Sequence, residues 1–91
     1  MTIEELYNII CDRRDNPVPD SYTVYLFSKG QDEILKKVGE ECIEVILAAK
    51  GQGKTRIIEE VADLTYHVLV LLAANSIAPS DITVELSQRH K

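Results

Sequence analysis

Residues 32–75, DEILKKVGEECIEVILAAKGQGKTRIIEEVADLTYHVLVLLAAN, contain the pattern that determines the fold. Apolar side chains recur three and four residues apart on both sides of Gly51-Gln52-Gly53, the spacing of one face of an α-helix. On the first side they form one stripe, which consists of Ile34, Leu35, Val38, Cys42, Val45, Ile46 and Ala49. A glycine just past the last helical position is typical of a helix end, and Thr55 is a suitable N-cap for the next helix. The segment therefore predicts two helices, 32–50 and 55–75, that form an antiparallel hairpin.

The segment before the hairpin also favours helices. Thr2 and Glu5 have the spacing of a capping box at the start of a helix over residues 3–14. Pro17 and Pro19 end that helix, because proline cannot continue the helical hydrogen-bond ladder.

Residues 22–28 are ambiguous from the sequence alone. Asp20 or Ser21 could cap a short helix, whereas Tyr22-Thr23-Val24-Tyr25 has the β-branched and aromatic content of a strand. The helical character of the remaining chain favours a short helix over residues 22–28.

The end of the chain predicts one more helix. Ser80 is its expected N-cap, acidic residues come early in residues 81–89, and the basic Arg89-His90-Lys91 comes late, as the helix macrodipole prefers. The prediction is an all-α fold, a small helical bundle centred on the hairpin. One domain spans residues 1–91.

The composition is that of a folded, acidic protein. The 91 residues are 45% hydrophobic and include 10 Lys and Arg against 15 Asp and Glu, a formal net charge of −5. The hydrophobic fraction argues against disorder. An acidic chain without a basic run is a poor partner for nucleic acid. A chain of this length has a small core, so we expect self-association.

The sequence points to a cytoplasmic protein without a membrane partner. The longest apolar run, Val68–Ala74, is far shorter than the roughly 20 residues of a transmembrane helix. Residues 1–5 lack the basic and apolar regions of a signal peptide. Cys11 and Cys42 form no metal-binding pattern, and each lies in an apolar periodic stretch. We therefore expect two reduced thiols in the core.

Four carboxylates mark the centre of the predicted hairpin. Glu41 and Glu44 are three residues apart on one helix, as are Glu60 and Asp63 on the other, so each pair shares a helix face. Glu41 and Asp63 are equidistant from Gln52, and so are Glu44 and Glu60. The two pairs are therefore expected at matching heights on neighbouring helices.

Their surroundings suggest a bound cation. Asp63 lies in a stretch that is apolar on nearly every face, which predicts that its carboxylate is buried. Converging carboxylates without a counter-charge would repel one another. Oxygen ligands alone suit Mg²⁺, or Mn²⁺, better than Zn²⁺. A single acidic pair is usually a solvated helix face, but two pairs in register favour a metal site. A di-iron site is disfavoured because it needs Glu-x-x-His pairs.

The acidic pattern resembles a known superfamily. Glu40-Glu41-x-x-Glu44 followed by Glu60-x-x-Asp63 is similar to the metal signature of the all-α nucleoside-triphosphate pyrophosphohydrolases, the MazG-like superfamily. Several longer motifs resemble its phosphoribosyl-ATP pyrophosphatase family. They are Asn16-Pro17, Ser21-Tyr22-Thr23-x-x-Leu26, Gly30, Lys36-Lys37-Val38-Gly39-Glu40-Glu41-x-x-Glu44-Val45 and Glu60-x-x-Asp63-Leu64-x-Tyr66-His67. This resemblance covers nearly the whole chain.

The resemblance implies hydrolysis of the α–β phosphoanhydride of phosphoribosyl-ATP to phosphoribosyl-AMP and pyrophosphate, the second step of histidine biosynthesis. One or two Mg²⁺ ions would be held by Glu41, Glu44, Glu60 and Asp63. The attacking water would be oriented or deprotonated by Glu40, Glu41 or Glu44. The substrate's phosphates or ribose would be bound by Lys36, Lys37, Ser21, Tyr22 and Thr23.

Several of these residues have an equally simple structural role. Lys36 and Lys37 could be a solvated helix surface, and residues 21–23 could serve only in capping and packing. His67 is expected to be a buried histidine with its hydrogen bonds satisfied. The apolar run over residues 64–74 exceeds what a short bundle can cover, which predicts a homodimer. Two alternatives to the histidine-pathway activity are a house-cleaning pyrophosphohydrolase and a non-catalytic helical dimerisation module.

Overall fold

The computed structural model describes residues 1–90, and within them the regular secondary structure is helical, without a strand. The helices are α1 (Ile3–Asp15), α2 (Tyr22–Lys29), α3 (Gln31–Gly51), α4 (Lys54–Ala74) and α5 (Pro79–Arg89). The predicted all-α fold and the short helix over residues 22–28 are confirmed. Lys91, at the basic end predicted for the last helix, lies outside the described residues.

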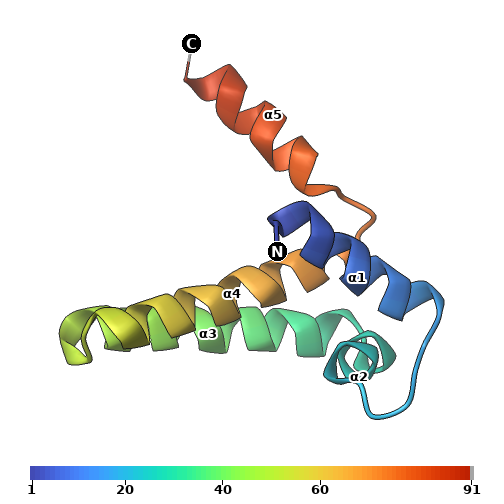
Figure 1. Ribbon diagram of the computed structural model, residues 1–91, viewed down its shortest axis with the longest axis horizontal. Helices are drawn as coiled ribbons and strands as arrows, with labels where there is room; N and C mark the ends of the chain where they lie inside the picture. The colour runs from blue at the N-terminus through green and yellow to red at the C-terminus, as the bar shows by residue number, and fades with distance from the viewer. Residues whose placement is uncertain (91) are drawn as a thin grey trace.

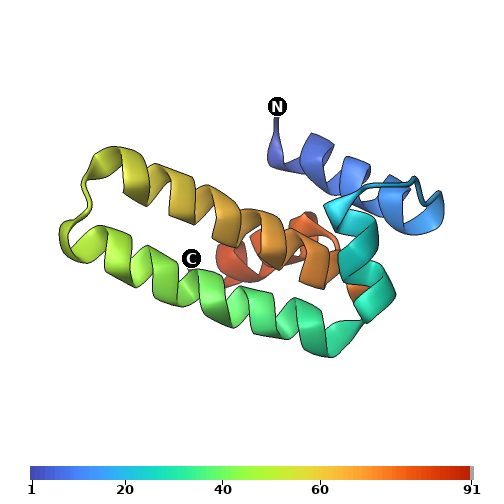
Figure 2. The same cartoon turned by 90° about the horizontal axis from the view of Figure 1, so that it is seen from below.

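Helices α3 and α4 form the antiparallel hairpin that the sequence predicts, and they lie side by side along their whole length (Figures 1 and 2). The turn between them needs a glycine, because Gly53 has a φ of 87°, in the left-handed region. Gly53 is also the N-cap of α4. The predicted capping role of Thr55 is therefore wrong, since the helix already begins at Lys54.

Side-chain caps fix the starts of α1 and α2. The Glu5 amide donates to Thr2 Oγ1 at 3.0 Å, and the Val24 amide donates to Ser21 Oγ at 3.2 Å. At α5 the predicted cap, Ser80, is wrong. The helix begins at Pro79, whose fixed φ suits the first helical position, and Ala78 is the N-cap.

The core lies where α1 and α2 pack against one end of the hairpin (Figure 1). Leu26 of α2 and Val70 of α4 are fully buried there. Cys11 is half-buried and packs against this core. We call this region, made of α1, α2 and residues 31–40 and 64–74 of the hairpin, the inner half.

The outer half is the part of the hairpin toward its turn, residues 42–59. Large apolar side chains are exposed along it, and these are Ile43, Ile46, Leu47 and Ile58, each with about half or more of its surface in solvent. Cys42 is exposed as well, so the prediction that it belongs to the core is wrong. The predicted apolar stripe of α3 is thus only partly covered, because α1 and α2 do not extend over this part of the hairpin (Figure 1).

Helix α5 projects away from the rest of the molecule (Figure 1). Its apolar side chains Ile82, Val84 and Leu86 are exposed. Most of residues 64–74 is buried or half-buried, but Leu64, Val68 and Leu72 line an open apolar pocket between α1, α4 and α5. Further uncovered apolar surface lies in the outer half and on α5. Within residues 1–90 none of the helices combines the length and the apolar character of a membrane span.

Candidate active site

Three carboxylates converge at the boundary between the inner and outer halves. Glu41 of α3 and Glu60 and Asp63 of α4 each offer an oxygen, and these oxygens all lie within 4.8 Å of one another. Their approach follows from the hairpin, which brings α3 and α4 side by side at this height. We call these three residues the acidic cluster.

Burial differs across the acidic cluster. Glu60 is buried, Glu41 is half-buried and Asp63 is exposed. The prediction that Asp63 is buried is wrong, because the apolar stretch around it is covered chiefly on the side that faces α3 and the inner half. The buried carboxylate of the second pair is Glu60 instead.

Two of the predicted site residues lie outside the acidic cluster. Glu44 is exposed, one turn closer to the Gly53 turn, and does not belong to the group of converging oxygens. Glu40 is exposed, and its Oε2 lies 3.9 Å from Lys37 Nζ. Both residues border the cluster on α3, and their catalytic roles stay predictions.

Basic side chains flank the acidic cluster at both ends. Lys37 Nζ lies 3.9 Å from Glu41 Oε1, one turn toward the inner half. Arg56 Nη2 lies 2.5 Å from Glu60 Oε1, one turn toward the outer half. Arg56 is not among the predicted site residues, although its spacing of four residues from Glu60 is that of a helical ion pair. Lys36 is exposed.

The electrostatics of the cluster favour a bound cation. Burial raises the pKa of the Glu41 carboxyl, and the nearby Asp63 carboxylate raises it further, while His67 and Lys37 act in the opposite direction. A raised carboxyl pKa means that negative charge is unfavourable at this position. A donor set of carboxylate oxygens, without sulfur, fits the hard divalent ions Mg²⁺ and Mn²⁺.

His67 links the cluster to α2. Its Nδ1 lies 2.7 Å from the Asp63 carbonyl, which can only accept, so Nδ1 carries the proton. Nε2 then accepts from the Tyr22 hydroxyl at 3.0 Å. Burial raises the pKa of Tyr22, and the neighbouring Tyr66 and Glu41 raise it further, which keeps the phenol protonated as the donor. The prediction of a buried His67 with satisfied hydrogen bonds is confirmed.

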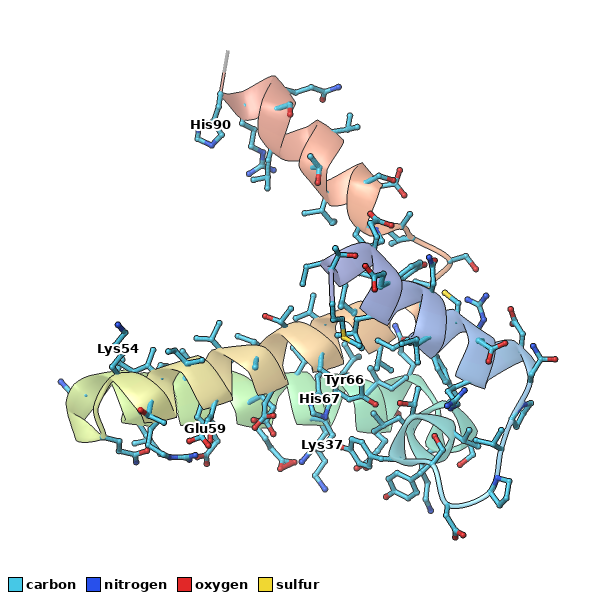
Figure 3. The ribbon with its side chains drawn as sticks, viewed as in Figure 1. Lys37, Lys54, Glu59, Tyr66, His67 and His90 are labelled. Atoms are coloured by element: carbon cyan, nitrogen blue, oxygen red, sulfur yellow. The ribbon has the colours of Figure 1, made fainter. Side chains whose placement is uncertain are left out.

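The predicted substrate-binding segment, residues 21–23, also has contacts within the protein. Ser21 caps α2, Tyr22 bonds to His67, and the Thr23 hydroxyl forms a hydrogen bond with the Tyr66 hydroxyl. Tyr22 nevertheless remains 46% exposed. In Figure 3, Tyr66, His67 and Lys37 lie on the same side of the hairpin as Glu59. That side carries the side chains that border the cluster.

Comparison with known proteins confirms the resemblance over almost the whole chain. Residues 3–90 match the family model described as phosphoribosyl-ATP pyrophosphohydrolase. The chain is 53% identical over 89 residues to the phosphoribosyl-ATP pyrophosphatase of Clostridium botulinum, covering 98% of this chain and 81% of the relative. Proteins of the same name in Bacillus thuringiensis and Pelotomaculum thermopropionicum are 49% and 51% identical over 89 residues, covering 98% of this chain and 83% and 91% of the relatives.

Proposed function

The chain belongs to the phosphoribosyl-ATP pyrophosphohydrolase family, and from this premise we propose that it hydrolyses the α–β phosphoanhydride of phosphoribosyl-ATP. The products are phosphoribosyl-AMP and pyrophosphate, and the reaction is the second step of histidine biosynthesis in the cytoplasm. The observation that carries this proposal is the acidic cluster at the centre of a chain that matches the family over residues 3–90. Membership of a hydrolase family disfavours the non-catalytic dimerisation module.

The acidic cluster supports a Mg²⁺ requirement, which Mn²⁺ would also satisfy. Glu41, Glu60 and Asp63 would hold the ion, with Glu44 as a further ligand from the adjoining turn of α3. When bound, a divalent cation neutralises charge on phosphate oxygens and stabilises the pyrophosphate leaving group. The convergence of three carboxylates, one of them buried, is the support for this assignment.

The remaining residues of the site bind substrate and water. Glu40, Glu41 or Glu44 orients the attacking water or accepts its proton. Lys37 and Lys36 bind phosphate oxygens, and the place of Lys37 beside Glu41 supports its share in this role. The segment 21–23 contacts the ribose or the phosphates, with the exposed edge of Tyr22 as its most accessible part.

We also propose that the enzyme is a homodimer. The apolar side chains of the outer half and of α5 are exposed in the isolated chain, which is a costly arrangement for so many large residues. A second copy of the chain would cover them and would enlarge a core that is small for independent stability.

A comparison of substrates tests the proposed activity. Pyrophosphate release is measured with phosphoribosyl-ATP and with a panel of deoxynucleoside triphosphates, each with and without Mg²⁺. We expect Mg²⁺-dependent turnover of phosphoribosyl-ATP that exceeds turnover of every member of the panel. Equal or faster turnover of the panel would identify a house-cleaning pyrophosphohydrolase instead.

A further inference from the structure

Arg56 is bound to a carboxylate that the proposed metal site also needs. Its guanidinium forms two hydrogen bonds, from Nη2 to Glu60 Oε1 at 2.5 Å and from Nη1 to Glu59 Oε1 at 2.9 Å. The side chain of Glu60 is 8% exposed, whereas those of Arg56 and Glu59 are 44% and 54% exposed. The guanidinium therefore lies between the buried carboxylate of Glu60 and solvent.

Glu60 needs a counter-charge whether or not a metal ion is present. A buried carboxylate without a cationic partner is strongly destabilising. Among residues 1–90, Arg56 is the basic side chain that pairs with Glu60, and no buried side-chain oxygen or nitrogen lacks a hydrogen-bond partner. Arg56 thus supplies the charge that a divalent cation would supply in the loaded enzyme.

We propose that Arg56 has two roles at this site. In the metal-free enzyme it is the counter-ion of Glu60 and competes with the divalent cation for that carboxylate. After the cation has displaced it, the guanidinium binds phosphate oxygens of the substrate. The second role rests on the proposed hydrolysis of phosphoribosyl-ATP, whereas the first rests only on the acidic cluster as a metal site.

The competition follows from the charges. A divalent cation and a guanidinium on the same carboxylate repel each other at close range, in a site whose buried side screens them poorly. Glu59 gives the guanidinium a second carboxylate, so Arg56 stays at the edge of the site when it leaves Glu60. The planar fork of arginine fits two oxygens of a phosphate group.

The chain provides a matched control for Arg56. Lys54 is two residues away on α4 and carries the same charge. Figure 3 shows it on the opposite side of the hairpin from Glu59 and Lys37. Lys54→Gln therefore removes one positive charge from the same helix without touching the acidic cluster.

The first experiment titrates MnCl₂ into wild type, Arg56→Gln and Lys54→Gln without nucleotide, with free Mn²⁺ followed by electron paramagnetic resonance. We expect Arg56→Gln to bind Mn²⁺ about fivefold more tightly, the scale of one partly exposed ion pair, and Lys54→Gln to match wild type. We also expect Arg56→Gln to melt lower than wild type in EDTA and to gain more in melting temperature from Mn²⁺. Unchanged or weaker Mn²⁺ binding in Arg56→Gln would overturn the competition.

The second experiment titrates pyrophosphate into the same variants in saturating Mg²⁺. Here Arg56→Gln should bind about fivefold more weakly, opposite in sign to its effect on Mn²⁺, and Arg56→Lys should lie between it and wild type. Unchanged pyrophosphate binding would refute the phosphate-binding role. If the Mn²⁺ result holds in a chain that fails to hydrolyse phosphoribosyl-ATP, the proposed activity fails together with the phosphate-binding role, and the competition stands. If the chain hydrolyses phosphoribosyl-ATP but Arg56→Gln changes neither Mn²⁺ nor pyrophosphate binding, only the two roles of Arg56 are refuted.

Discussion

Helices α3 and α4 run through both the inner and the outer half, and the two parts of this hairpin differ in what covers them. In the inner half, α1 and α2 bury residues such as Leu26, Ile34 and Val70 almost completely. In the outer half, Cys42, Ile46 and Ala49 of the predicted stripe are exposed, although the helical periodicity continues. A regular apolar stripe therefore shows which face of a helix is to be covered, but not by which chain.

The acidic cluster lies where these two environments meet. Glu60 is buried against the hairpin, while Asp63 reaches solvent and so can be approached by a charged substrate. The inner half holds the adjoining residues in place through the bond from Tyr22 to His67 and from Thr23 to Tyr66. We infer that the inner half gives the site its rigidity and the boundary gives it access.

The largest loss of activity is expected from a substitution in the acidic cluster, at the boundary between the two halves. Asp63→Asn keeps the size of the side chain but removes its charge, so we expect turnover of phosphoribosyl-ATP to fall by up to about a thousandfold, with the helical circular dichroism unchanged. Melting in EDTA should not be lowered, because the repulsion between Asp63 and Glu41 is relieved. Glu85→Gln on α5, which removes a charge away from the cluster, is the control. Full activity of Asp63→Asn would contradict a role for the acidic cluster.

A pair of substitutions, one in each half, tests whether the same chain or a second copy covers the apolar side chains. Leu26→Ala empties a fully buried position and should lower the free energy of unfolding by about 3 kcal/mol at every protein concentration. Ile46→Ala, in the outer half, should lower it only at concentrations at which the dimer forms. Urea unfolding at several concentrations measures both. Equal, concentration-independent losses would show that the outer half is covered within one chain.

A charged residue in the outer half tests directly whether this surface is the interface of the proposed homodimer. Ile58→Asp places a carboxylate on the exposed apolar surface, and we expect the dimer to dissociate about thirtyfold more readily, corresponding to about 2 kcal/mol. The fold of the single chain should survive, since Ile58 is 59% exposed. Analytical ultracentrifugation over a concentration series gives the dissociation constant. A wild-type chain that stays monomeric at all concentrations would refute the proposed homodimer.

The smallest expected effect is a pH dependence of the inner half. Burial raises the pKa of the Tyr66 hydroxyl, although the hydrogen bond with Thr23 lowers it in part. The stability from the neutral phenol is present below the ordinary tyrosine pKa of about 10 and is lost as the pH rises through the raised value. Above about pH 10, the free energy of unfolding of Tyr66→Phe should therefore fall less steeply than that of wild type. Parallel urea-unfolding profiles would contradict this expectation.

The sequence predicted the hairpin and the approach of Glu41 to Asp63 because both depend on local regularities. Helical spacing and the glycines fix the hairpin, and equal distances from Gln52 set the heights of the two acids. The pairing of Arg56 with Glu60 is just as local, and the spacing of four residues could have revealed it.

Other features could not be predicted because they depend on how distant helices dock. The bonds from Tyr22 to His67 and from Thr23 to Tyr66 join residues more than forty positions apart. The exposure of Cys42 and Asp63 depends on where α1 and α2 stop covering the hairpin. Periodicity marks an apolar face in both halves alike, so it could not reveal that boundary.

The most direct test of the central claim is a crystal structure of the enzyme soaked in Mn²⁺, with the ion located by its anomalous scattering. We predict one or two Mn²⁺ ions bound by oxygens of Glu41, Glu60 and Asp63, and Arg56 moved away from Glu60. The same map would show whether Glu44 turns in to complete the ligand set. The absence of Mn²⁺ from the acidic cluster, in crystals that retain activity in Mn²⁺, would contradict the account.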